Sequence, residues 1–165
     1  MATIHLLEGP VGAGKSTYAA QLSHAHRAPH LNLDEWLVTL FRPDRPEADF
    51  MAWYLERKDR CLAQIWATAG ALLDLEIDVV LELGLVQAAA RQAFYERADA
   101  EDRALIVYLL ETPKAERWAR VQCRNVSGQG RYHMPVDEAM FELANNAWEP
   151  PSSAERRARA IREIS

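Results

Sequence analysis

Residues 9–16 of the chain read GPVGAGKS, and Thr17 follows them. The segment fits the phosphate-binding loop pattern of a glycine, four further residues and then Gly-Lys-Ser or Gly-Lys-Thr. A short apolar run before it predicts a strand over residues 1–7, and apolar side chains at helical spacing after it predict a helix over residues 15–26. Because a strand, a glycine-rich turn and a helix start together present backbone N–H groups to an anion, we expect this segment to bind phosphate.

Each residue type in the loop has a physical role. Glycines take positive φ angles and let the backbone approach the phosphates. Lys15 is expected to reach the β- and γ-phosphates, and the Ser16 hydroxyl is expected to bind Mg²⁺. The predicted nucleotide-binding residues are Gly9, Gly12, Ala13, Gly14, Lys15, Ser16 and Thr17. The pattern therefore predicts a nucleoside triphosphate ligand, taken to be ATP with Mg²⁺, although no residue distinguishes adenine from guanine.

Size and charge narrow the classes of function. A chain of 165 residues is expected to form one domain, and its 49% hydrophobic and 26% charged residues are ordinary for a globular protein. The net charge of −5 argues against a nucleic-acid partner, because such proteins usually carry a basic surface. No apolar run approaches the roughly 20 residues that a membrane span requires, and the first residues resemble a strand rather than a signal peptide. We therefore expect a cytoplasmic protein without a membrane partner.

The rest of the chain alternates between predicted strands and helices. The predicted strands are residues 1–7, 30–33, 77–83 and 104–110. The predicted helices are residues 15–26, 35–41, 47–75, 87–100, 113–125 and 135–148. Thr112 is expected to cap the helix that begins at Pro113. The tail favours a helix by composition, although residues 159–164 are equally compatible with a fifth strand at the edge.

This alternation predicts an α/β fold in three layers. A parallel sheet of four or five strands is expected between layers of helices. Ligands of such sheets bind at the carboxyl ends of the strands. The residues that follow each predicted strand are therefore the ones to examine for chemistry.

Two carboxylates are predicted at that edge. Asp34 follows the second strand, where a carboxylate can accept the proton of a hydroxyl that attacks the γ-phosphate. It can equally cap the helix that begins near Glu35. Glu82 lies late in the third strand, and a carboxylate in an apolar run is costly to bury without a partner. We favour Mg²⁺, its bound water or a substrate hydroxyl as that partner over a structural arginine.

Arginines recur along the helix that follows the fourth strand. Arg117, Arg120 and Arg124 are spaced by three and four residues, and Arg131 comes after a glycine turn. Such arginines suit a lid over residues 117–134 that closes on the phosphates and neutralises the transferring phosphoryl group. A solvated helix face is the alternative. Arg120 and Arg124 are the main lid candidates.

Three further residues are candidates for contact with a substrate. Trp36 belongs to the region over residues 35–75, whose aromatic side chains are expected to form core or the wall of an acceptor pocket. Arg91 follows the third strand and either reaches back toward the site or lies at the surface. His133 lies in the predicted lid.

Together these pieces resemble the small P-loop kinases of the AAA-type ATPase class, whose relatives include zeta toxin, chloramphenicol phosphotransferase and the kinase domain of phage polynucleotide kinase. The resemblance rests on residues 9–17, Asp34, residues 79–84, Arg91, residues 116–125 and residues 148–151. It implies a nucleoside-monophosphate-kinase-like fold with a lid, ATP with Mg²⁺, and phosphoryl transfer to a hydroxyl. It also implies that Asp34 is the general base and that Arg120 and Arg124 belong to the lid. Relatives often carry Asp where this chain has Glu82.

Three functions follow, and the first is favoured. The chain is expected to be an ATP-dependent kinase that phosphorylates a hydroxyl of a small molecule, which binds near Asp34 under the helices of residues 35–75. A kinase of polynucleotide 5′-hydroxyl ends is the second candidate, and the acidic balance of the chain argues against it. A regulatory nucleotide-binding protein with little turnover is the third, and its site would lack a poised base and an acceptor pocket.

Overall fold

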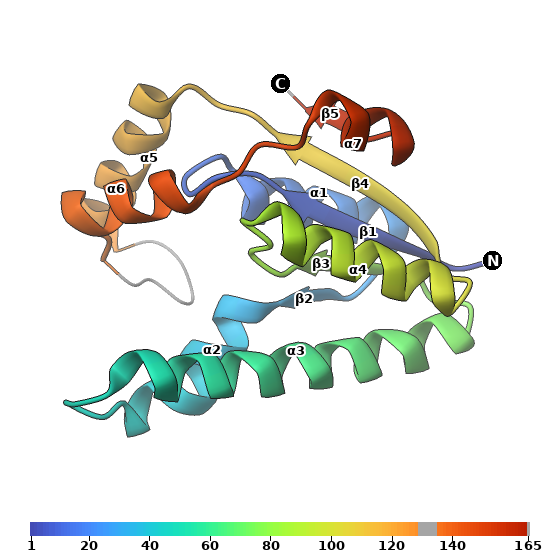
Figure 1. The fold of residues 1–165 in the computed structure, drawn as a ribbon, viewed down its shortest axis with the longest axis horizontal. Helices are drawn as coiled ribbons and strands as arrows, with labels where there is room; N and C mark the ends of the chain where they lie inside the picture. Colours follow the sequence, from blue (N-terminus) through green and yellow to red (C-terminus); the bar gives the residue numbers. More distant parts are fainter. Residues whose placement is uncertain (129–134, 165) are drawn as a thin grey trace.

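A parallel sheet forms the centre of the molecule (Figure 1). The computed structural model describes residues 1–128 and 135–164. Within these residues the strands are β1 (Thr3–Glu8), β2 (His30–Asn32), β3 (Val79–Glu82), β4 (Ala104–Leu110) and β5 (Arg162–Ile164). They pair in the order β2-β3-β1-β4-β5, and every pairing is parallel. The predicted α/β fold with a parallel sheet is confirmed.

Helices cover both faces of this sheet. The helices are α1 (Lys15–His26), α2 (Leu33–Phe41), the 3-10 helix η1 (Arg42–Asp44), α3 (Phe50–Asp74), α4 (Ala88–Ala100), α5 (Lys114–Ser127), α6 (Glu138–Ala147) and α7 (Ser153–Ala158). Successive residues of a strand point to opposite faces, so Leu6 of β1 packs in the cluster that contains α3 and α4, whereas Leu7 packs in the cluster that contains α1. The nearly continuous apolar strands of the sequence are thus buried on two sides.

The sequence of the tail was compatible with a helix or with an edge strand, and the structure contains one of each. Residues Ser153–Ala158 make the short helix α7, and Arg162–Ile164 then make the edge strand β5 beside β4. Ser152 caps α7 by accepting a hydrogen bond from the Glu155 N–H. The fifth strand of the sheet is therefore present.

Two predicted helix starts were wrong. Helix α2 begins at Leu33 rather than near Glu35, because Asn32 ends β2 and its side chain caps the helix at once. Helix α5 has Pro113 at its N-cap without a capping side chain, so Thr112 does not cap it. The Thr112 hydroxyl instead faces the carbonyl oxygen of Ala13, 3.4 Å away.

The carboxyl ends of β1 and β4 lead toward α5 and α6, which lie side by side at one end of the molecule (Figure 1). Trp118 of α5 and Phe141 of α6 hold the two helices together, with their ring centroids 5.0 Å apart. Among the described residues, no helix is both long enough and apolar enough to cross a bilayer.

Candidate active site

The phosphate-binding loop, Asp34 and Glu82 lie at one edge of the sheet. The loop continues directly from β1, and Glu82 is the last residue of β3. Leu7 of β1 and Asn32 of β2 are both register partners of Glu82. Since the strands are parallel, their carboxyl ends meet here, as the strand pattern predicted.

The loop is held in a shape that requires glycine at two positions. Gly9 has φ of 149°, and a Cβ atom there would lie 2.6 Å from the carbonyl oxygen of Leu110. Gly12 has φ of 76°, and a Cβ atom there would lie 2.8 Å from the carbonyl oxygen of Arg117. Both neighbours are backbone atoms, so a side chain would displace the main chain of β4 or α5. The loop is therefore packed directly against these two elements.

The start of α1 is open to an anion. Its N-cap is Gly14, which has a left-handed conformation and no capping side chain. The N–H groups of the first helical turn consequently have no side-chain acceptor, and the helix dipole favours negative charge at this end. Thr17 lies in this first turn and is exposed. These features are typical of a phosphate site.

Lys15 folds over the loop. Its Nζ atom donates to the carbonyl oxygens of Gly9, at 2.8 Å, and of Pro10, at 2.9 Å. The surrounding protein lowers the pKa of Lys15, while the negative charges of Glu82 and Asp34 act to raise it. The ammonium group thus lies between the loop and two carboxylates.

Ser16 and Glu82 are in direct contact. The Ser16 hydroxyl donates to the Glu82 carboxylate, with distances of 2.9 Å to Oε1 and 3.1 Å to Oε2. Two residues of β2 hold the same carboxylate: Asn32 Nδ2 donates to Oε2 at 2.9 Å, and His30 Nε2 lies 3.2 Å from Oε2. Glu82 is buried, and its partners are these polar groups rather than an arginine.

Asp34 lies in the first turn of α2, and the interpretation of its side chain as a helix cap was wrong. Asn32 Oδ1 accepts the hydrogen bonds from the backbone N–H groups of Asp34, at 2.9 Å, and of Glu35, at 3.2 Å. The Asp34 carboxylate is accessible to solvent but is surrounded by protein. Loss of bulk water around it is the main cause that raises its pKa, and the charge of Glu82 raises it further. Lys15 has the opposite effect on this pKa.

The two main lid candidates face this edge from α5. Arg120 Nη1 donates to the carbonyl oxygen of Ala13 at 3.3 Å, and its side chain is half exposed. Arg124 is exposed, and its charge acts on both Lys15 and Asp34. Within residues 1–128 and 135–164, the Arg124 guanidinium has no hydrogen-bond partner.

Arg117 is not a lid residue. Its guanidinium is buried and donates to the carbonyl oxygens of Thr112, at 2.9 Å, and Val11, at 3.0 Å, and to Asn145 Oδ1, at 2.6 Å. These bonds join the phosphate loop to α5 and α6. A buried guanidinium that is hydrogen-bonded in this way serves the structure rather than a ligand.

Arg91 does not reach the site either, and both of its predicted placements were wrong. It is fully buried and donates to both carboxylate oxygens of Glu155, at 2.7 and 3.1 Å. Trp36 is half-buried and packs against the core cluster. His133 and Arg131 lie outside the described residues.

Sequence reasoning missed four polar residues at this edge. Asn32 and His30 hold Glu82, as described above. Lys58 and Tyr54 of α3 interact electrostatically with Asp34: the Lys58 charge lowers the pKa of Asp34, and the Asp34 charge, after burial, raises the pKa of Tyr54. The sequence carried only a weak signal for Asn32: asparagine is a preferred cap, but the predicted helix began at Glu35 and the predicted strand ran through Asn32.

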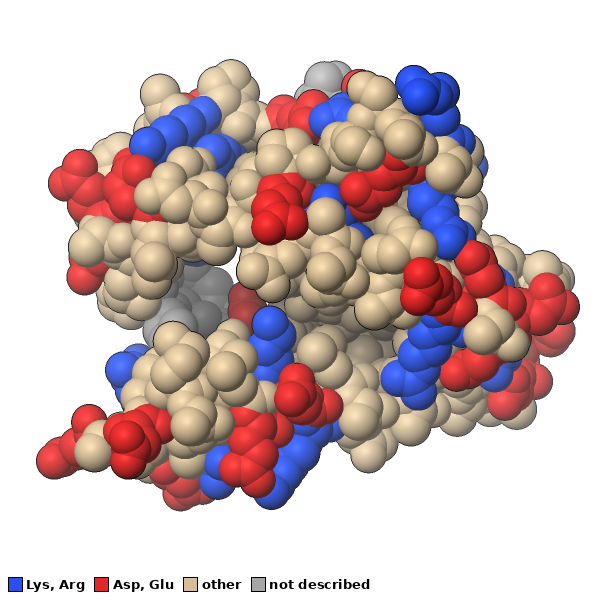
Figure 2. Space-filling model, viewed as in Figure 1, with Lys and Arg blue, Asp and Glu red and all other residues tan. Residues whose placement is uncertain are grey.

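Figure 2 shows the molecular surface hollowed between α6 and the neighbouring start of α3. The hollow opens on the side toward which the strands end. Helix α3 belongs to the region of residues 35–75 for which the sequence predicted the acceptor site, whereas α6 (Glu138–Ala147) follows the predicted lid of residues 117–134.

Comparison with known sequences identifies one family. The sequence profile of a family described as an AAA domain matches residues 4–151. No curated protein matches the chain.

Solved structures share the fold. A gluconokinase from Sinorhizobium meliloti 1021 is 18% identical, with a TM-score of 0.62, and the match covers 99% of this chain and 81% of that chain. Kti12 from Chaetomium thermophilum, solved in complex with ADP-AlF3, is 15% identical with a TM-score of 0.71, and the match covers 98% and 88%. A chain of the Pnkp1/Rnl/Hen1 RNA repair complex is 19% identical with a TM-score of 0.65, and the match covers 88% and 43%. At these identities the likeness concerns the fold, which is that of P-loop kinases.

Proposed function

We propose that this chain, which belongs to the AAA domain family, is an ATP-dependent phosphotransferase that moves the γ-phosphate to a hydroxyl group of a small molecule. The observation that supports this most strongly is the contact between Ser16 and Glu82, at 2.9 Å, beside the Lys15 ammonium. A phosphate-binding loop alone would serve any nucleotide-binding protein. A loop with a carboxylate pair at the same edge, Glu82 and Asp34, has the groups that phosphoryl transfer needs.

The residues present fit a magnesium ion. Ser16 and Glu82 offer hydroxyl and carboxylate oxygens, the donors that Mg²⁺ prefers, and they are already within hydrogen-bonding distance of each other. When bound, the ion would neutralise charge on the β- and γ-phosphates. His30 and Asn32 would keep the Glu82 carboxylate oriented toward Ser16.

The chemical roles of the remaining residues follow from their charges. The loop N–H groups and Lys15 would hold the phosphates, and Arg120 and Arg124 would approach the transferring group from α5. Asp34 would accept the proton of the acceptor hydroxyl as its oxygen forms a bond to the γ-phosphorus. The bond between that phosphorus and the β–γ bridging oxygen breaks, and ADP leaves. The raised pKa of Asp34 makes it a better proton acceptor than an ordinary aspartate.

Helices α2 and α3 would form the acceptor site, under a lid that begins on α5. Lys58 and Tyr54 of α3 interact electrostatically with Asp34 and offer one positive charge and one hydroxyl. Such a pair suits a polar, hydroxyl-rich acceptor. The net charge of −5 favours a small molecule over a nucleic acid, and an ATP-dependent reaction fits the cytoplasm.

The test is Mg-ATP-dependent phosphate transfer across a panel of hydroxyl compounds, read by mass spectrometry. The panel contains aminoglycosides, chloramphenicol, nucleosides, sugars and an oligonucleotide with a 5′-hydroxyl. Lys15→Ala is the inactive variant, and Lys114→Ala is its matched control, because Lys114 is exposed and pairs with Glu142 on the surface.

We expect one small-molecule class to gain a phosphate with the wild-type protein and with Lys114→Ala, but not with Lys15→Ala. Phosphate on the oligonucleotide alone would replace the proposal with a polynucleotide kinase. ATP binding without transfer to any member of the panel would favour a regulatory nucleotide-binding protein.

A further inference from the structure

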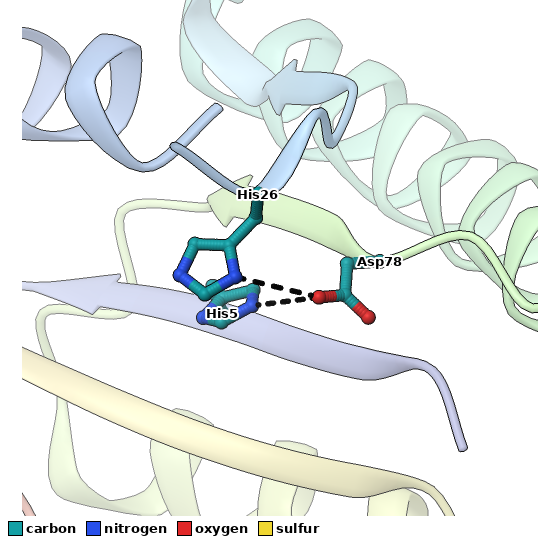
Figure 3. A group of neighbouring side chains, drawn as sticks. All are labelled: His5, His26 and Asp78. Atoms are coloured by element: carbon teal, nitrogen blue, oxygen red, sulfur yellow. Dashed lines mark hydrogen bonds and ion pairs between the residues drawn. The ribbon is translucent and has the colours of Figure 1, made fainter. Parts of the chain in front are cut away.

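A second cluster of polar side chains lies at the other edge of the sheet, away from the phosphate loop (Figure 3). His5 comes from β1, His26 is the last residue of α1, and Asp78 directly precedes β3. Their side chains converge although the residues are 21 to 73 positions apart in the sequence. The proposed phosphotransfer uses none of the three.

One carboxylate oxygen is the point of convergence. His5 Nε2 lies 3.4 Å from Asp78 Oδ2, and His26 Nδ1 lies 3.6 Å from the same oxygen. One ligand atom from each residue lies within 4.8 Å of the other two. Figure 3 shows both imidazole rings directed at that carboxylate.

These spacings match the edges of a metal coordination shell. Zinc binds imidazole nitrogen and carboxylate oxygen at about 2.0–2.2 Å in tetrahedral geometry, which sets neighbouring ligands about 3.3 Å apart. The two nitrogen–oxygen separations of 3.4 and 3.6 Å are close to that value. The rings of His5 and His26 lie beside each other, with centroids 4.1 Å apart.

Two of the atoms that would not touch the metal already have partners. His5 Nδ1 lies 3.0 Å from the Tyr108 hydroxyl, and Asp78 Oδ1 accepts a hydrogen bond from the Thr3 N–H at 2.8 Å. Outer partners of this kind orient the rings and carboxylates of metal sites. They leave His5 Nε2 and Asp78 Oδ2 facing the position between the three residues.

We propose that His5, His26 and Asp78 bind one Zn²⁺ ion, with solvent as the fourth ligand. Two imidazoles and one carboxylate favour zinc over the hard cations Mg²⁺ and Ca²⁺, which prefer oxygen alone. His5 is buried, whereas the side chains of His26 and Asp78 are 39% and 27% exposed, so the ion can enter from that side. The bound ion ties the end of α1 to β1 and β3, and thereby fixes the helix whose other end carries Lys15 and Ser16.

The test compares two histidines of α1. His26→Ala removes an exposed ligand, and His24→Ala is the matched control, because His24 is exposed on the same helix and lies outside the cluster. Each protein is purified without nucleotide, given one equivalent of ZnCl₂ and dialysed; its metal content is then measured by mass spectrometry. Thermal unfolding is recorded separately with free Zn²⁺ and with free Mg²⁺.

Wild type and His24→Ala should retain one zinc per chain, and their Tm should rise by about 5–10 °C when free zinc is a hundred times the dissociation constant. His26→Ala should lose both effects, and any shift that Mg²⁺ gives should be the same in wild type, His24→Ala and His26→Ala, because Ser16 and Glu82 lie outside the cluster. The proposal is overturned if wild type retains no zinc, or if His26→Ala retains as much as His24→Ala.

A zinc ion bound at the phosphate edge must be distinguished, because His30 and Glu82 are also close together there. His30→Gln separates the two cases. Zinc retention that survives His30→Gln supports the cluster of His5, His26 and Asp78. If zinc is instead lost in His30→Gln and kept in His26→Ala, the metal binds beside His30 and Glu82, and the proposal is overturned.

Discussion

Asn32 donates a hydrogen bond from Nδ2 to Glu82 Oε2 at 2.9 Å, while its Oδ1 atom caps α2. A single amide therefore links the carboxylate beside Ser16 to the helix turn that carries Asp34. An aspartate would cap the helix equally well but would repel Glu82, and a serine would cap the helix without reaching the carboxylate through an amide. Only an amide side chain serves both contacts.

Substitution of Asn32 should separate these two contacts. Asn32→Ala is expected to lower the free energy of unfolding by about 0.5–2 kcal/mol, because α2 loses its cap. Asn32→Ser should recover most of that loss. Both variants should reduce turnover about 10–100-fold, since the Glu82 carboxylate loses a donor that orients it. Denaturant unfolding and steady-state kinetics measure the two effects, and recovery of turnover by Asn32→Ser would contradict the role assigned to the amide.

Asp34→Asn should act on turnover rather than on nucleotide binding. Loss of a general base costs about 10²–10⁴-fold in rate, whereas the phosphate loop stays intact, so ATP affinity is expected to hold. Glu35→Gln removes the neighbouring carboxylate and is the matched control. In wild type, kcat should rise with pH as Asp34 ionises, at a higher pH than for an ordinary aspartate, because its pKa is raised. Weaker ATP binding with unchanged turnover of bound ATP would exclude Asp34 as the base.

Two arginines of α5 should give opposite results on substitution. Arg124→Ala is expected to reduce kcat about 10²–10³-fold with an unchanged Tm, because the guanidinium is exposed and its charge acts on Lys15 of the phosphate loop. Arg117→Ala should destabilise the protein by about 1–3 kcal/mol, because it leaves the partly buried acceptors on Val11 and Asn145 unpaired. Thermal unfolding and kinetics of both variants check this contrast, which a fall in Tm for Arg124→Ala would contradict.

Glu8 should make stability depend on pH near neutrality. Burial is the main cause that raises its pKa from 4.5 to about 7, against the hydrogen bond from the Tyr95 hydroxyl and the charge of Arg91. Between these two pH values the folded state keeps a proton that the unfolded state has lost. The free energy of unfolding therefore falls as pH rises through this interval, and the loss is complete above it.

Glu8→Gln is a neutral stand-in for the protonated carboxyl group. The variant should match wild type near pH 4.5 and be more stable above pH 7, since each unit of pKa difference corresponds to about 1.4 kcal/mol. Glu47→Gln changes an exposed carboxylate and should keep the wild-type slope. Denaturant unfolding across this pH range measures the difference, and parallel curves for wild type and Glu8→Gln would refute the assignment.

Sequence patterns predicted the local structure well, because it depends on near neighbours. Helix α1 and strand β4 have the predicted bounds, and the glycine loop has the expected positive φ angles. Glu82 stood out because a carboxylate interrupts an apolar strand, and it does meet the loop serine. The catalytic and metal roles of these residues stay predictions.

Long-range pairing is what the sequence did not reveal. Arg91 and Arg124 look alike in the sequence, but Glu155, which is 64 residues away from Arg91, buries the first of them in an ion pair. The sequence likewise did not show whether Arg117 belongs to a lid or to a structural contact; in the structure it donates a hydrogen bond to Asn145 of α6. Whether an arginine is buried and paired or exposed depends on the acceptor that the fold places beside it. A distant acceptor of this kind cannot be recognised from the residues next to the arginine in the sequence.

The three bonds of Arg117 have a consequence for residues far from the nucleotide. One of them holds the carbonyl oxygen of Val11, so the phosphate loop is tied to α5 without a ligand. A pre-ordered loop loses little conformational entropy on binding, which strengthens affinity without any added contact. Asn145 of α6 completes the brace, and natural variation at that remote position would therefore alter how long a nucleotide stays bound.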